Sequence, residues 1–80
     1  MVSLFAPAQI EMFSEAVMGT VEKTISQNQP GRVKCLGSYW PARFYHSNCD
    51  VIVFIDEVVK VVGRQGITML VVPVSSIKTD

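Results

Sequence analysis

The stretch GRVKCLGSYWPARF, residues 31–44, decides the fold because its side chains alternate as they do in a β-hairpin. Small or apolar side chains occupy every second position on each arm: Val33, Cys35, Trp40, Ala42 and Phe44. Successive side chains of a strand point to opposite faces, so this set shares one face of the hairpin. We expect a two-residue turn at Gly37-Ser38, with the glycine at the first central position of a type II′ turn.

The rest of the chain also has the composition of short strands. Runs rich in β-branched residues alternate with turn signals about every ten residues, as in small barrels. The remaining strands are expected at residues 18–25, 57–63 and 67–74. Residues 50–57, DVIVFIDE, are either a further short strand or a buried approach to the next one. The chain is therefore expected to be all-β, a small five-stranded barrel whose closure removes free strand edges.

The first residues have a different spacing. Apolar side chains follow a helical period at Leu4, Ile10, Phe13 and Val17. This predicts a short helix or turn at 7–13, or a lid that packs Phe5, Ile10 and Phe13 over one end of the barrel. The expected divisions are an N-terminal helical or lid segment at 1–15, the barrel at 16–75 and a polar tail at 76–80.

Composition limits the kinds of partner. Of the 80 residues 49% are hydrophobic, mean hydropathy is +0.32 and the net charge is zero. A domain of this size cannot bury that much apolar surface in its own core. We therefore expect some of the apolar surface to contact a partner or a second copy, as in a homo-oligomer. A neutral chain has no long-range attraction for nucleic acid, although a local patch can still bind it.

The sequence also indicates a cellular compartment. No secretory signal is visible, and no apolar run approaches the roughly 20 residues that cross a bilayer. The two cysteines do not form a disulfide framework. We therefore expect a cytoplasmic protein with reduced thiols, without a transmembrane segment, that reaches a membrane only through a partner.

The order of several small motifs resembles the soluble C-terminal domain of NfeD-like proteins. They are Gly19-x-Val21, Pro30-Gly31-x-Val33, Gly37-x-x-Trp40-x-Ala42 and Val59-x-Val61-Val62-Gly63-x-x-Gly66-Ile67-x-x-Leu70-x-Val72. The resemblance covers about residues 17–74 and implies an OB-fold barrel. It also implies a protein–protein module that accompanies stomatin- or flotillin-like membrane scaffolds. Members of that family usually carry membrane helices before this domain, and we expect this protein to be a stand-alone short form without them. It also carries Asp56-Glu57 where glycine is common in the family.

Two surfaces are candidates for binding. OB-folds bind single-stranded nucleic acid with aromatic and basic side chains on the strands of this hairpin. The corresponding set is Arg32, Lys34, Tyr39, Arg43 and Tyr45. The second candidate is an apolar interaction surface of residues that alternation places outside the barrel: Leu36, Ile52, Phe54 and Met69. The alternative is that the N-terminal segment covers and buries these side chains.

No residue pattern indicates catalysis, a metal or a cofactor. His46 and Cys49, with Asp50 beside them, have the spacing of half a zinc site, but a closed site needs four ligands and only Cys35 remains. Asp56 and Glu57 are adjacent and would point to opposite faces of a strand, which suits no acid–base pair. We expect a protein that is not an enzyme and has no cofactor.

Overall fold

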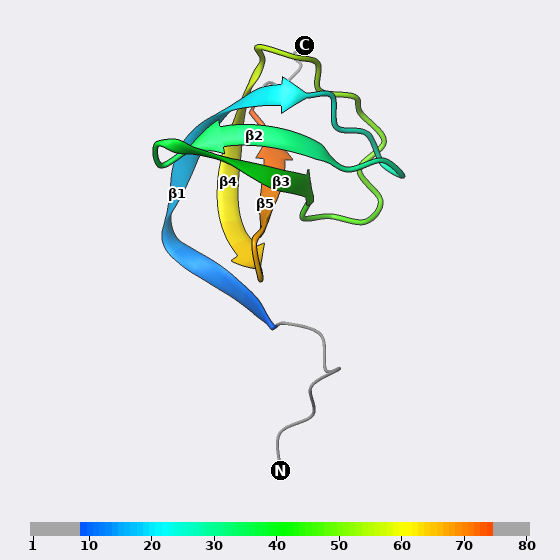
Figure 1. Cartoon of the computed structure of the whole chain (residues 1–80). Coiled ribbons are helices and arrows are strands. Elements are labelled where there is room, and N and C mark those ends of the chain that lie inside the picture. Colours follow the sequence, from blue (N-terminus) through cyan, green and yellow to red (C-terminus); the bar gives the residue numbers. More distant parts are fainter. Residues whose placement is uncertain (1–8, 75–80) are drawn as a thin grey trace.

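The computed structural model describes residues 9–74, which form a closed barrel without a helix in that range (Figure 1). The five strands are β1 (Ile10–Lys23), β2 (Gly31–Cys35), β3 (Ser38–Phe44), β4 (Val58–Gln65) and β5 (Thr68–Pro73). They close in the order β1-β2-β3-β5-β4, and only the β3–β5 pair is parallel. The predicted all-β, five-stranded, OB-fold-like barrel is confirmed.

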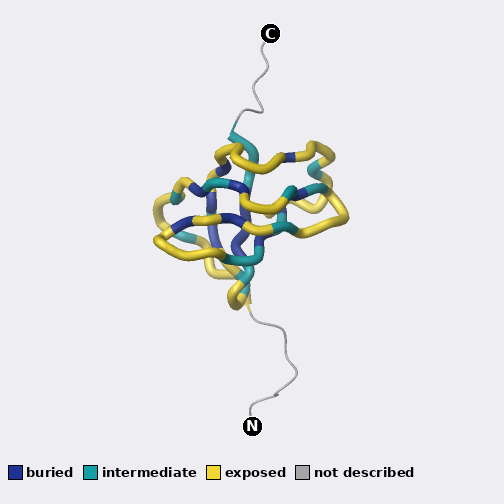
Figure 2. Tube along the Cα trace, turned by 45° about the horizontal axis from the view of Figure 1, so that its top comes forward, coloured by how far each residue is buried: buried dark blue, intermediate teal, exposed yellow. Residues whose placement is uncertain are grey.

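One hydrophobic cluster fills the barrel and draws side chains from every strand. In β1 to β4 the buried positions, dark blue in Figure 2, follow the strand period of two, so the inward side chains of neighbouring strands meet along the barrel axis. In β5 three consecutive residues, Met69, Leu70 and Val71, are buried. The inward hairpin residues behave as the alternation predicts, with Val33 and Ala42 fully buried. Trp40 is partly buried against the cluster, and its indole Nε1 donates a hydrogen bond of 3.1 Å to the carbonyl of Cys35.

The hairpin turn lies one residue earlier than predicted. Cys35 pairs with Ser38, so the turn residues are Leu36 and Gly37, with φ of 53° and 77°. Positive φ at both positions defines a type I′ turn, not the expected type II′ turn at Gly37-Ser38. Both registers leave the same side chains on the same faces, which is why alternation could not distinguish them.

The predicted N-terminal helix is wrong over residues 10–13, which belong to β1; residues 7 and 8 lie outside the described range. The first part of β1 pairs with the end of β4, with Met12 opposite Gly63, and pairing resumes at Val17 after an irregular stretch. Hydrogen bonding to β4 therefore overrides the helical spacing. The expected boundary between residues 15 and 16 falls inside this strand.

Of the two lid side chains within the described residues, one fits the lid interpretation. Phe13 packs partly buried against the core, whereas Ile10 is half-exposed. Phe5 lies outside the described residues. Figure 1 shows the early part of β1, in blue, extending beyond the body of the barrel.

The connection from β3 to β4, residues 45–57, forms neither a full strand nor a helix. One isolated bridge joins Val53 to Ile25, which follows β1. A four-residue turn then leads into β4, closed by a 3.1 Å hydrogen bond from the amide of Glu57 to the carbonyl of Phe54. Asp56, with a φ of 76°, occupies the position of this turn that normally takes glycine.

Candidate protein-interaction surface

The segment before β4 exposes a set of apolar side chains because one of its residues is anchored inside the barrel. Val53 is 5% exposed and belongs to the core. Its neighbours Ile52 and Phe54 point the other way and are 52% and 57% exposed. We call the exposed apolar residues of this segment, together with the first residue of β4, the apolar ridge: Val51, Ile52, Phe54, Ile55 and Val58.

The backbone under the ridge is fixed to the end of β1 by four hydrogen bonds. Ile25 and Val53 exchange two bonds of 3.0 Å. Two more bonds of 2.8 Å join Val21 to the far end of the segment. The amide of Val21 donates to the carbonyl of Glu57, and the amide of Asp56 donates to the carbonyl of Val21. These hydrogen bonds restrict the backbone of the ridge almost as a strand ladder would. Less conformational entropy is therefore lost when a partner binds.

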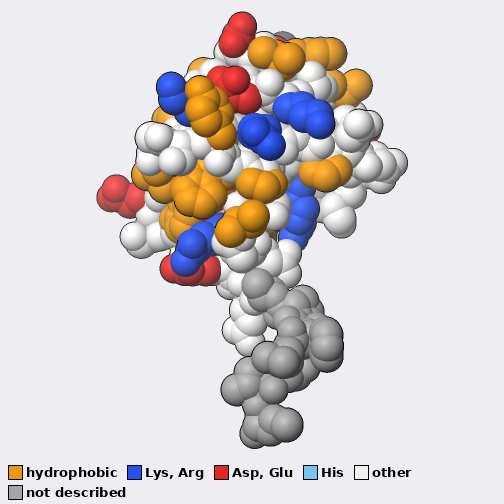
Figure 3. All heavy atoms as spheres, in the orientation of Figure 1, with side chains coloured by type: hydrophobic (Ala, Val, Ile, Leu, Met, Phe, Trp, Pro, Cys, Tyr) orange, Lys and Arg blue, Asp and Glu red, His pale blue; other side chains and the backbone are white. Residues whose placement is uncertain are grey.

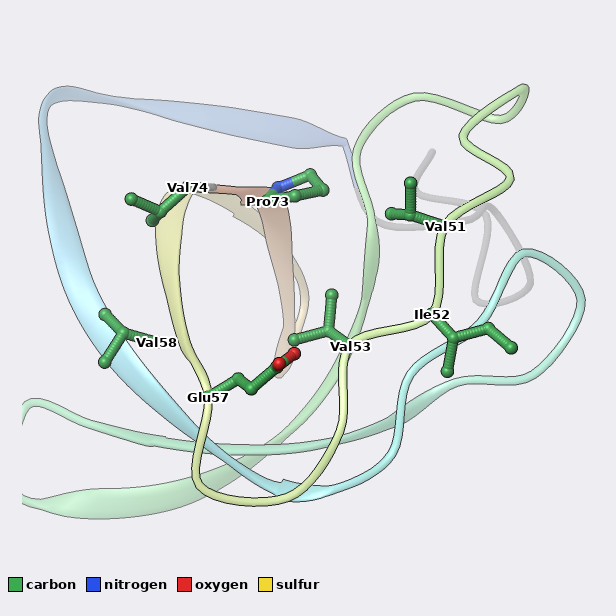
Figure 4. Close-up of a pocket in the computed structure, with 7 residues that line it drawn as sticks. All are labelled: Val51, Ile52, Val53, Glu57, Val58, Pro73 and Val74. Atoms are coloured by element: carbon green, nitrogen blue, oxygen red, sulfur yellow. The ribbon is translucent and has the colours of Figure 1, made fainter. Parts of the chain in front are cut away.

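Beside the ridge lies a groove of about 380 Å³ between this segment and the end of β5 (Figure 4). Its lining is apolar except for Glu57: Val51, Ile52, Val53, Val58, Pro73 and Val74. In Figure 4 the Glu57 carboxylate reaches toward Val53. One of its oxygens accepts a hydrogen bond of 3.0 Å from the amide of Phe54, which fixes the side chain in the turn.

The same segment carries only negative formal charge. Asp50, Asp56 and Glu57 lie within it, and residues 44–59 contain no Lys or Arg. All three acidic residues are exposed. The surface thus combines an apolar ridge and groove with an acidic border, which fits an apolar partner segment flanked by cations.

Three of the four residues predicted for an apolar interaction surface are exposed, but they do not form one patch. Ile52 and Phe54 belong to the ridge. Leu36 is 64% exposed in the β2–β3 turn, on a different side of the barrel from the β3–β4 connection (Figure 1).

Met69, the fourth residue, is only 2% exposed, so its place in that surface is wrong. It belongs to the core cluster, and its strand β5 is paired on both edges, with Met69 opposite Ala42 and Arg64. The prediction missed Val51, Ile55 and Val58, which complete the ridge. Their signal was the uninterrupted apolar run itself, since a strand-like segment cannot point every side chain inward.

The outward face of β2 and β3 brings together part of the predicted nucleic-acid set. Lys34 lies opposite Tyr39 in the ladder, with its Nζ 5.6 Å from the ring centroid, a cation–π contact. Arg32 and Tyr39 line a shallow depression with Glu22 and Lys23 of β1. Figure 3 shows Lys and Arg side chains interspersed with hydrophobic ones on this side of the molecule. We call Lys23, Arg32, Lys34 and Tyr39 the basic face.

The other two residues of that predicted set are engaged elsewhere. Arg43 is half-buried, and its guanidinium donates to the side-chain oxygen of Gln65 on β4 and, at 3.5 Å, to the carbonyl of Phe44. The ring of Tyr45 makes an edge contact with that of His46, with centroids 4.9 Å apart and planes at 71°. The structure therefore gathers three of the five predicted residues.

The cysteine and histidine positions do not converge. Among residues 9–74 no group of three or more His, Cys, Asp or Glu side chains is placed to hold a metal ion. Cys35 is buried in the core, and this burial raises the pKa of its thiol. Cys49 is partly buried against the same core, and its amide donates to the carbonyl of His46 at 3.3 Å.

Comparison of the chain with protein-family models, with curated proteins and with solved structures finds no match. Within the described range there is no helix of the length and hydropathy needed to cross a membrane.

Proposed function

We propose that this protein is a non-enzymatic interaction module of the NfeD-like kind, and that it docks a protein partner on the apolar ridge and its groove. Following the family resemblance, the proposed partner is a stomatin- or flotillin-like membrane scaffold, bound on the cytoplasmic side. The observation that carries the proposal is that five exposed apolar side chains gather within residues 51–58, on a backbone hydrogen-bonded at Val53, Asp56 and Glu57.

The energetics favour binding at this place. Burying one large apolar side chain that is otherwise exposed contributes about 1.5–3 kcal/mol. Ile52 and Phe54 are each more than half exposed. An interface that buries both side chains therefore gains a substantial part of the binding free energy of a complex with micromolar affinity. The fixed backbone keeps the ordering cost low. A mobile loop of the same composition would bind more weakly.

The test is a calorimetric titration of the protein with the cytoplasmic domain of the stomatin- or flotillin-like protein encoded in the same genome. The wild type should bind, and the double variant Ile52→Ser/Phe54→Ser should bind at least about tenfold more weakly, the equivalent of about 1.4 kcal/mol. Tyr45→Ser, an exposed aromatic residue outside the ridge, is the matched control and should leave affinity unchanged. Absence of binding by the wild type, or equal binding by the double variant, contradicts the proposal.

A second candidate function is single-stranded nucleic-acid binding on the basic face. The observation in its favour is that Lys23, Arg32 and Lys34 lie with Tyr39 on this face, against the single acid Glu22 in the same depression. Stacking of a base on Tyr39 and phosphate contacts from Arg32 and Lys34 would be the physical basis.

Fluorescence anisotropy with a labelled oligothymidylate at low salt tests this second candidate. Binding should weaken steeply with salt, and Arg32→Ala and Tyr39→Ala should each reduce it. Arg64→Ala, which removes a cation paired with Glu11, should not reduce it. No binding at low salt eliminates this function, since phosphate contacts are strongest there.

A further inference from the structure

The acidic border of the ridge and the basic face are complementary, although the chain as a whole is neutral. The basic face carries three cations, Lys23, Arg32 and Lys34, against one adjacent acid, Glu22, which lines the same depression. Residues 46–57 carry only Asp and Glu among the Lys, Arg, Asp and Glu types. Each surface also presents apolar or aromatic side chains, the ridge on one and Tyr39 on the other. Surfaces of opposite charge and shared apolar character match one another.

These charged side chains do not form ion pairs with one another within the described residues. In residues 9–74 the ion pair between Glu11 and Arg64, 3.1 Å apart, is the only one present, and it lies at the early part of β1. The cations of the basic face and the carboxylates of Asp50 and Asp56 therefore have no ion-pair partner in the described chain. Both sets are exposed on hydrogen-bonded backbone or on its adjoining turns.

We infer that this protein self-associates through unlike faces, with the apolar ridge of one copy docked on the basic face of a second copy. This inference rests on the proposed function, because it assigns a partner to the same docking surface. Two such contacts formed reciprocally close a dimer, and one contact per copy extends the assembly. In an extended assembly the terminal copy keeps a free ridge for the scaffold partner.

The two faces can be disabled separately. The basic face is reversed by Arg32→Glu with Lys34→Glu, both outward strand positions without a backbone role beyond the ladder. The ridge is disabled by Asp50→Lys with Ile52→Lys, which replaces an exposed acid and an exposed aliphatic side chain while keeping the bridge of Val53 to Ile25. Glu15→Lys, a charge reversal at an exposed position of β1 outside both faces, is the control.

Sedimentation velocity at about 100 µM protein, where contacts of micromolar affinity are populated, gives the test. The wild type and Glu15→Lys should sediment as dimers or larger species at low salt, and about 0.5 M salt should weaken the association severalfold. Each double variant alone should be monomeric. An equimolar mixture of the two should form a one-to-one dimer, because one intact ridge then meets one intact basic face.

The mixture also controls for folding, since a dimer forms only if each variant keeps the fold of its intact face. A wild type that stays monomeric overturns this inference and leaves the proposed function to its own titration with the scaffold domain. A mixture that stays monomeric, or a double variant that associates like the wild type, also overturns it. Loss of scaffold binding with self-association intact overturns the proposed function alone.

Discussion

Leu36 and Asp56 hold a positive φ, a conformation that most side chains avoid because of steric contact with the backbone. Leu36 occupies a turn position that favours Asn or Gly, and Asp56 occupies one that favours Gly. Leu36 is exposed, so core packing does not offset the steric cost of its positive φ. The turn is therefore less stable than the same turn with Asn or Gly at this position.

Replacement of Leu36 by Asn should therefore stabilise the protein by about 0.5–1 kcal/mol, because Asn tolerates the left-handed region. Urea denaturation measures the change as a shift of the midpoint. Leu36→Val, with a branched Cβ, should shift it the other way and serves as the control. If Leu36→Asn lowers the midpoint, leucine makes a contact that the exposed turn does not show.

The two thiols should differ in reactivity. Cys35 is 4% exposed, and burial raises its pKa, so little thiolate forms and little of it is accessible. Cys49 is partly exposed. With iodoacetamide at neutral pH, mass spectrometry should find Cys49 modified at least about tenfold faster than Cys35. Comparable rates would mean that the barrel opens locally on the time scale of the reaction.

At the scale of elements, the alternation in the sequence identified both arms of the β2–β3 hairpin and their inward faces. It failed for the first half of β1. Residues 10–13 have a helical spacing, and only the pairing with the end of β4, more than 50 residues later, makes them a strand. A long-range partner of that kind leaves no local signal in the sequence.

Gly63 is what allows that pairing. A Cβ at this position would lie 2.6 Å from the carbonyl oxygen of Glu11 and 3.1 Å from the Cα of Met12. Gly63→Ala should therefore release the first part of β1, and hydrogen–deuterium exchange of residues 10–12 should become much faster.

The matched control for Gly63→Ala is Arg64→Gln, which removes only the exposed ion pair with Glu11. Exposed pairs contribute about 0–1 kcal/mol, so protection of residues 10–12 should change little in this variant. Equal protection of these residues in Gly63→Ala and the wild type would contradict the steric explanation.

At the scale of the whole molecule, composition predicted surplus apolar surface, but it could not predict where that surface would gather. The ridge arises because Val53 is fixed inward by Ile25, a contact between segments far apart in sequence. Net charge likewise concealed the uneven distribution of charge, with three cations against Glu22 at the basic face and only carboxylates beside the ridge. The burial of Met69 was likewise not predictable from the sequence, because only closure of the barrel pairs β5 on both edges.

Because one core cluster unites all five strands, the barrel should unfold in a single cooperative step. Tryptophan fluorescence from Trp40 and far-ultraviolet circular dichroism should give the same urea midpoint. Ile25→Ala, which truncates a fully buried side chain, should lower the unfolding free energy by about 2–5 kcal/mol in both signals. Two separate transitions would contradict a single core.

The direction of the first and last strands has a mechanical consequence. Strands β1 and β5 are each antiparallel to β4 and so run the same way, with the start of β1 and the end of β5 at opposite ends of the barrel (Figure 1). A pull on these two ends slides the strands along their axes and loads the ladder hydrogen bonds together, since these bonds lie across the strands. A module held between two tethered partners would carry tension in its stiffest direction.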